Sequence, residues 1–234
     1  MTGASEEHGR ATLWFATRPA VDLPLPGRWE EVPDTDWNSA WKADMRPVVV
    51  GRVTVIPPWL DPPAGSDLVV VIEPGMAFGT GHHETTTGCL AALQELDLHG
   101  RRLIDLGTGT GVLAIAAALL GAADVVAVDH DPEAVAVARR NVRSHDVAVD
   151  VREASAADVT EPADVVVANL VTDTLIELAG PLQRLLRPRG TLIASGASIE
   201  RAGEVAAALA AAGLTARSRS GRQWAVLIAH RPPG

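Results

Sequence analysis

The chain has 234 residues, of which 47% are hydrophobic and 21% charged, and its formal net charge is −9 at pH 7. This length suits one large domain with a buried core, alone or with a small appendage. The negative charge disfavours a protein whose main ligand is a phosphate backbone, so we expect no direct nucleic-acid binding. The single cysteine, Cys89, excludes an internal disulfide framework and a cysteine-based zinc site, and it suits a reducing cytoplasm.

The sequence shows neither a targeting segment nor a membrane span. Its N-terminus carries Glu6 and Glu7 without an apolar stretch, so we expect no secretory signal. The longest mainly apolar run, residues 112–123, is shorter than the roughly 20 residues that a bilayer requires. We therefore expect a cytoplasmic protein with no membrane partner.

Residues 1–65 differ in composition from the rest of the chain. They contain five of the six tryptophans and more than half of the prolines. Proline removes a backbone donor and disrupts helix interiors, so long helices are excluded here. Trp37 and Trp41 share one helical face, which we expect to pack on the larger domain; a surface that contacts substrate is the alternative. The expected elements are strands at 11–17 and 48–56 and a short helix at 35–43.

From residue 66 onward, apolar runs alternate with amphipathic stretches. Nearly continuous apolar strands, such as 125–128, indicate burial on both faces. The alternation predicts an α/β fold over 66–234, with a doubly wound, mostly parallel, seven-stranded Rossmann-like sheet. The short turn Gly221-Arg222 predicts an antiparallel hairpin at one edge. The expected strands are 68–72, 102–106, 124–129, 147–151, 163–169, 191–195, 215–220 and 223–229, and the expected helices are 82–96, 112–120, 132–144, 173–186 and 200–212.

A glycine-rich turn follows the strand at 102–106 and reads D-L-G-T-G-T-G over residues 105–111. Gly107, Gly109 and Gly111 let the backbone bend sharply and let a ligand approach where a Cβ would otherwise stand. The helix that follows offers free N–H groups at its positive end. Val112 stands where dinucleotide-binding turns carry their third glycine, and no lysine follows as in a P-loop.

The next strand ends at Asp129, whose carboxylate can accept both hydrogen bonds of a ribose diol. A D-x-G-x-G-x-G turn with this acidic strand end resembles the class I S-adenosylmethionine-dependent methyltransferases. Two roles stay open for Asp105: binding the cofactor's ammonium through a water, or satisfying N–H groups of the turn. Asp131 is expected to cap the helix that Pro132 begins. A turn without a ligand and an NAD site are the weaker alternatives.

The fourth core strand ends in Asn169-Leu170-Val171. Methyltransferases of nucleobases or glutamine amides usually carry Asn/Asp-Pro-Pro-aromatic at this place, so a planar acceptor is disfavoured. Asn169 can offer its carbonyl oxygen to an amine and its amide to the cofactor. The alternative is that it only caps the end of the strand.

A second motif, E-P-G-M-A-F-G-T-G-H-H-E-T-T at residues 73–86, precedes the first helix of the domain. It resembles the D-P-G-x-A-F-G-T-G-T-H-P-T-T signature of the PrmA family, which trimethylates amino groups of ribosomal protein L11. The Asn169-Leu170-Val171 segment resembles that family's Asn-Ile-Leu, and the resemblance extends over residues 35–234. The positions that resemble the family's linker are Trp37, Trp41, Pro47, Gly51 and Pro57.

The resemblance implies a protein N-methyltransferase that uses S-adenosylmethionine and acts on lysine or other amino groups, most simply those of ribosomal protein L11. It also implies that residues 78–81 cover the methionine end of the cofactor. The cofactor-binding residues that we expect from the resemblance and the glycine turn are Phe78, Gly79, Thr80, Thr86, Asp105, Gly107, Gly109, Gly111, Asp129 and Asn169.

The family's Thr-His-Pro is replaced here by His82-His83-Glu84. We expect Asn169 and residues 78–84 to position the amine, while Glu84, His83 or water removes its proton. Glu84 has a favoured alternative role as a first-turn acid that interacts with the helix dipole. The adjacent histidines diverge in direction and lack a third ligand at metal spacing, so no metal site is expected.

The family carries a whole domain before its linker that binds the ribosomal protein. Residues 1–34 are too few for an independent core, which usually needs about 40 residues or more. Two alternatives therefore stay open beside methylation of L11. One is methylation of another protein or a small amine, and the other is cofactor binding without turnover. Dehydrogenase activity is disfavoured by Val112.

Overall fold

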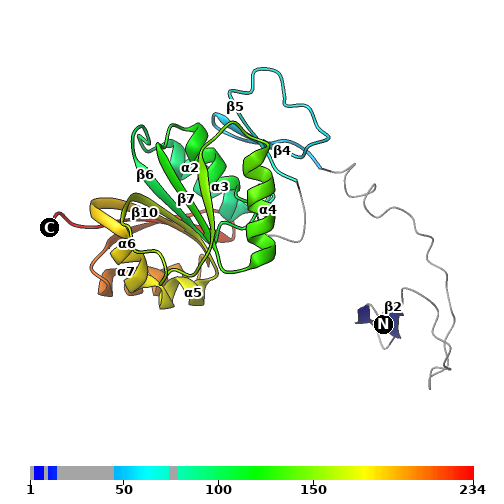
Figure 1. Cartoon of the computed structure of the whole chain (residues 1–234). Helices are drawn as coiled ribbons and strands as arrows, with labels where there is room; N and C mark the ends of the chain where they lie inside the picture. Colours follow the sequence, from blue (N-terminus) through cyan, green and yellow to red (C-terminus); the bar gives the residue numbers. More distant parts are fainter. Residues whose placement is uncertain (1–2, 8–9, 15–44, 74–78) are drawn as a thin grey trace. The chain divides into compact units, whose positions relative to one another are not determined.

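The computed structural model describes residues 3–7, 10–14, 45–73 and 79–234 (Figure 1). The chain divides into two compact units, Met1–Asp44 and Met45–Gly234. In the first unit, strands β1 (Gly3–Glu7) and β2 (Arg10–Trp14) pair as an antiparallel hairpin. The expected helix at 35–43, with Trp37 and Trp41, lies outside the described residues.

The larger unit begins with a three-stranded sheet in which β3 (Val48–Val50) and β4 (Val53–Ile56) are antiparallel and β4 is parallel to β5 (Leu68–Val71). The single strand expected at 48–56 is therefore wrong. Gly51 has a φ of 54°, and the chain reverses there within two residues. Because β4 pairs with β5, residues 45–65 pack with the larger unit, although the change in composition had indicated a boundary at 65/66.

The central sheet has seven strands in the order β11-β12-β10-β9-β6-β7-β8. Strands β8, β7, β6, β9 and β10 run parallel to one another, while β12 is antiparallel to both β10 and β11. The predicted α/β class, the parallel sheet and the antiparallel edge are confirmed. The strand bounds are β6 (Arg102–Leu106), β7 (Asp124–Asp129), β8 (Val149–Glu153), β9 (Ala163–Asn169), β10 (Leu186–Ser198), β11 (Thr215–Ser220) and β12 (Trp224–His230).

Helices cover both faces of this sheet, and each face has its own apolar core. The side chains of α2, α3 and α4 belong to one core, which also includes the small β3–β5 sheet. Those of α5, α6 and α7 belong to the other, and Figure 1 shows the two groups on opposite sides of the sheet. The helix bounds are α2 (Glu84–Gln94), α3 (Val112–Leu119), α4 (Pro132–Arg143), α5 (Thr172–Glu177), α6 (Ala179–Leu185) and α7 (Ala202–Ala211).

The expected helix at 173–186 is two short helices, α5 and α6, which meet at Leu178. Pro181 has no backbone N–H to donate to the carbonyl of Glu177, so one continuous helix would lose a hydrogen bond at that point. Strand β10 is longer than expected, and its register with β9 shifts between Leu186 and Thr191.

Candidate active site

A cavity of about 670 Å³ opens at the carboxyl ends of the parallel strands, a size typical of small-molecule and cofactor sites. The strand order reverses between β6 and β9, and open α/β sheets bind ligands at such a reversal. The lining comes from the ends of β6, β7 and β9 and the segments that follow them, and from the segment after β8. Gly196 within β10, the start of β12 and the start of α2 complete it. The lining residues are His83, Thr85, Leu106, Gly107, Gly109, Val128, Asp129, His130, Asp131, Ala134, Ala154, Ser155, Ala156, Asn169, Leu170, Val171, Thr174, Leu178, Gly196 and Trp224.

The glycine turn forms one wall of this cavity. Gly107, Gly109 and Gly111 all have positive φ, at 74°, 55° and 85°, which explains the glycine at each alternate position. A Cβ at Gly107 would overlap the side chain of Leu170. Gly111 precedes the first residue of α3, so the turn delivers a helix N-terminus to the site, as predicted.

Asp129 lies at the end of β7, and its carboxylate is mostly buried. Oδ2 accepts the backbone N–H of Gly109 at 2.9 Å, and Oδ1 accepts that of Asp131 at 3.1 Å. A carboxylate accepts up to about four hydrogen bonds, so capacity remains on the cavity side. The next residue but one, Asp131, caps α4 by accepting the N–H of Glu133 at 2.9 Å, as predicted.

Asp105 lies beneath the glycine turn and is fully buried. The Thr108 hydroxyl donates to Oδ2 at 2.7 Å, while Oδ1 has no hydrogen-bond partner among the described residues. Burial raises the pKa of Asp105 to about 6; the Thr108 hydroxyl and, more weakly, the Ala114 N–H oppose the rise, and the charge of Asp129 adds to it. A cationic or hydrogen-bonding ligand would relieve this unsatisfied acceptor.

The segment before α2 is fixed to the glycine turn. The hydroxyl of Thr110 donates to the carbonyl of Gly79 at 2.6 Å, and the side-chain amide of Asn141 donates to the carbonyl of Thr110 at 2.8 Å. Gly79 has a φ of 109°, and a Cβ there would lie within 2.8 Å of the Thr110 hydroxyl. Gly79 thus contacts the turn, but neither Gly79 nor Thr80 lines the cavity. Phe78 lies outside the described residues.

Asn169 lines the cavity at the end of β9, and its Nδ2 donates to the buried hydroxyl of Thr86 at 3.4 Å. This contact joins two residues that are distant in sequence and that were both expected at the site. It also directs the carbonyl oxygen of the amide away from Thr86.

His83 and Glu84 lie at the start of α2 but face different surroundings. His83 lines the cavity and caps the helix, with Nδ1 accepting the N–H of Thr85, and its ring packs edge to face on Trp224 with centroids 5.2 Å apart. Both carboxylate oxygens of Glu84 instead accept backbone N–H groups of the β11–β12 turn, from Arg222 and Gln223. Glu84 is not among the residues that line the cavity.

Five of the expected site residues meet on the cavity surface, while four others support it from below or behind. The supporting residues are Thr86, Asp105, Gly79 and Gly111. Trp224 is the main lining residue that the sequence did not indicate, because it belongs to no local motif and reaches the site only through the pairing of β12 with β10. The five expected residues on the cavity surface are His83, Gly107, Gly109, Asp129 and Asn169.

The residues present fit S-adenosylmethionine, the cofactor that the resemblance implies. Asp129 and the glycine turn offer a carboxylate and close backbone, and Asp105 carries a buried oxygen without a partner. In the described part of the chain, no group of three or more His, Cys, Asp or Glu side chains is arranged to hold a metal ion. No helix in that part has the length and apolar character needed to cross a membrane.

The strand order, the glycine turn and the acidic end of β7 define a class I methyltransferase fold. Comparisons with known proteins narrow this class. The family model for ribosomal protein L11 methyltransferase (PrmA) matches residues 17–232. The chain therefore belongs to the PrmA family.

Individual proteins that are similar to this chain also bear the name of ribosomal protein L11 methyltransferase or methylase. The ribosomal protein L11 methyltransferase of Deinococcus radiodurans is 41% identical over 247 residues, covering 98% of this chain and 90% of the relative. That of Symbiobacterium thermophilum is 43% identical, covering 91% and 70%. The crystal structure of a ribosomal protein L11 methylase from Lactobacillus delbrueckii subsp. bulgaricus matches with a TM-score of 0.74 and 26% identity, over 80% of this chain and 98% of that one.

The first prediction concerns Asp105→Asn. Because the folded-state pKa of Asp105 is raised to about 6, folding favours its protonated form, and the cofactor-free protein loses stability as pH rises from about 4 to 6. The amide that replaces this carboxyl carries no charge, so the variant does not share this loss. The Tm of the variant minus the Tm of the wild type should therefore rise between about pH 4 and pH 6. Its affinity for S-adenosylmethionine should fall by about 1–2 kcal/mol. Differential scanning calorimetry measures the Tm as a function of pH, and titration calorimetry measures the affinity.

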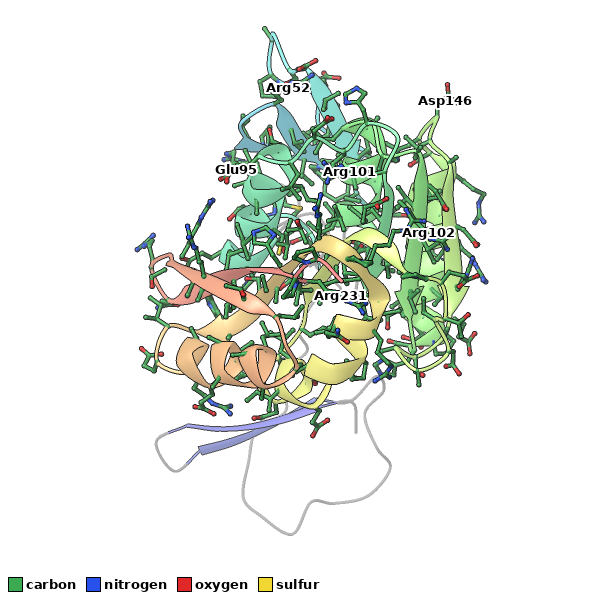
Figure 2. The ribbon with its side chains drawn as sticks, turned by 90° about the vertical axis from the view of Figure 1, so that its left-hand side faces the viewer. Arg52, Glu95, Arg101, Arg102, Asp146 and Arg231 are labelled. Atoms are coloured by element: carbon green, nitrogen blue, oxygen red, sulfur yellow. The ribbon has the colours of Figure 1, made fainter. Side chains whose placement is uncertain are left out.

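The control for this experiment is Asp146→Asn, because Asp146 is exposed at the position labelled in Figure 2. Its melting curves should parallel those of wild type. Parallel curves for Asp105→Asn as well would show that Asp105 carries no raised pKa.

A second prediction concerns Asp129→Asn, which removes the charge and one of the acceptor oxygens at the end of β7. We expect S-adenosylmethionine to bind more weakly by about 1–3 kcal/mol, because hydrogen bonds to a charged acceptor are lost. Titration calorimetry checks this. Asp124→Asn, at the opposite end of the same strand, is the matched control and should bind normally. Equal affinities for the two variants would contradict a cofactor role for Asp129.

Proposed function

We propose that this protein transfers methyl groups from S-adenosylmethionine to amino groups of ribosomal protein L11. The observation that carries the proposal is that Asp129 and Asn169, the two polar strand ends expected at the cofactor and the acceptor, line one cavity beside the glycine turn. Membership of the PrmA family supports the acceptor. Ribosomal proteins are made in the cytoplasm, and this is the compartment that the proposal implies.

When bound, S-adenosylmethionine supplies an electrophilic methyl group on a sulfonium. The protein's part is to align a neutral nitrogen with that group, at a separation of about 3–3.5 Å. Asn169 suits this part because Thr86 holds one end of its amide and the carbonyl oxygen can accept a hydrogen bond from an amine. The partly apolar lining excludes water and lowers the pKa of a lysine amine, whose ordinary value is about 10.4.

The group that removes the proton is His83 or water in this proposal. Glu84 was a third candidate, but its carboxylate binds two backbone N–H groups away from the cavity lining. His83 lines the cavity and stands beside Trp224.

The alternative acceptor is another protein or a small amine. The D. radiodurans relative, which bears the L11 methyltransferase name and is 90% covered by this chain, favours L11. Cofactor binding without turnover is the remaining candidate.

A third prediction tests the proposed function directly. Purified ribosomal protein L11, incubated with this protein and S-adenosylmethionine, should gain mass in whole methyl-for-hydrogen increments. Asn169→Ala should slow the initial rate on the order of 100-fold, because the amine is no longer held in line. Mass spectrometry measures both. No increment despite cofactor binding would move the acceptor to another amine, to be sought in cell extract with labelled cofactor.

A fourth prediction separates His83 from water as the proton acceptor. His83→Asn keeps an oxygen that can cap α2 but removes the imidazole. If His83 takes the proton, the rate should fall about 100-fold and recover in part with added imidazole. His82→Ala is the control, because His82 is exposed and contacts the carbonyl of Arg46. Equal rates for His83→Asn and wild type would assign the proton to water.

A further inference from the structure

The turn between β11 and β12 is bound by a side chain from a distant helix. Its two central residues are Arg222 and Gln223, and Gly221 donates its N–H to the carbonyl of Trp224 at 2.8 Å to close it. The backbone N–H of Arg222 donates to Oε1 of Glu84, and that of Gln223 donates to Oε2 at 3.1 Å. One carboxylate therefore binds both central N–H groups of the turn.

The turn is shaped for this carboxylate. A Cβ at Gly221 would overlap Oε1 of Glu84, so a side chain at this position would displace the carboxylate from the turn. On another side, the carbonyl of Gln223 accepts the N–H of Ile199 at 3.1 Å. The turn is thus held between α2 and the segment that follows β10.

Both partners of this contact adjoin a wall of the cavity. His83 directly precedes Glu84, and Trp224 directly follows Gln223. The two rings pack on each other at an interplanar angle of 61°, and both line the cavity that Asn169 also lines. Binding of the turn by Glu84 therefore sets where the indole lies relative to the imidazole.

We propose that Glu84 is a positioning residue that holds Trp224 against His83 and so shapes the acceptor end of the cavity. This inference rests on the proposed function only for its effect on the acceptor. An indole beside the reacting nitrogen attracts a cationic amine and limits the width of the opening. The PrmA signature has proline at position 84, so the contact belongs to this chain and not to the signature.

Glu84→Pro separates this role from that of a helix-starting residue. Proline is favoured at the first position of a helix, and His83, with φ −74° and ψ 140°, already has the extended backbone that precedes proline. The variant should therefore fold while losing both acceptor oxygens. Glu84→Gln keeps one oxygen and removes the charge. The matched control is Glu95→Gln, because Glu95, which directly follows α2 and is labelled in Figure 2, pairs with Arg219 of β11 and leaves the turn untouched.

The first readout does not depend on the acceptor. The full chain is labelled with fluorotryptophan, and the fluorine resonance of Trp224 is assigned among the six tryptophans by its loss in Trp224→Phe. Glu84→Pro should shift or broaden this resonance, Glu84→Gln should do so less, and Glu95→Gln should leave it in place. A Trp224 resonance that is unchanged in Glu84→Pro would overturn the proposal.

The second readout is steady-state methylation of ribosomal protein L11. In Glu84→Pro we expect the KM for L11 to rise about fivefold to tenfold, while the affinity for S-adenosylmethionine stays at the wild-type value. If the Trp224 resonance moves but the KM for L11 stays unchanged, Glu84 positions Trp224 without affecting binding of the acceptor, and that part of the proposal is wrong. Failure of the wild-type protein to methylate L11 would instead contradict the proposed function, and the resonance would still decide the role of Glu84.

Discussion

The attachment of the glycine turn to the end of β7 is the constraint on which the site depends. The N–H groups of Gly107 and Thr108 both donate to the carbonyl of Val128, at 2.8 and 2.9 Å, and that of Gly109 donates to Asp129. These bonds leave the strand-end carboxylate beside the turn and direct the start of α3 toward the cavity. Without them, the positive-φ glycines would have no reason to adopt a single conformation, since glycine has the most backbone freedom to lose.

Helix α2 fixes the positions of two hairpin turns, one at each of its ends. At its start, Glu84 binds the β11–β12 turn, and at its end Gln94 binds the β3–β4 turn through the N–H of Arg52 at 2.7 Å and the carbonyl of Val50 at 2.8 Å. One face of the helix is buried in the apolar core, and close packing there holds the helix in place. The same helix and its N-cap thereby hold Thr86 and His83 in place.

Local pattern was enough to predict most of the fold and to place the glycine turn and Asp129 at the cavity. Apolar runs marked the central strands, and the glycine turn with Asp129 forms one contiguous signal. Trp224 and the contacts of Glu84 escaped prediction because they join residues 138 or more positions apart, which only the sheet pairing brings together. The break at Leu178 and the reversal at Gly51 were missed for a different reason, since a single proline or glycine there overrides the surrounding apolar periodicity.

Two carboxylates near the glycine turn are held in opposite surroundings. Asp129 accepts two backbone N–H groups and reaches the cavity, so its charge is supported by the fold itself. Asp105 is buried with one oxygen unsatisfied, and burial opposes its charge. An acid buried in this way lowers the stability of the protein at pH values where it would otherwise ionise. Asp105 lies beneath the turn and outside the cavity lining, so a ligand could reach its unsatisfied oxygen only through a water, while its other oxygen already binds Thr108 of the turn.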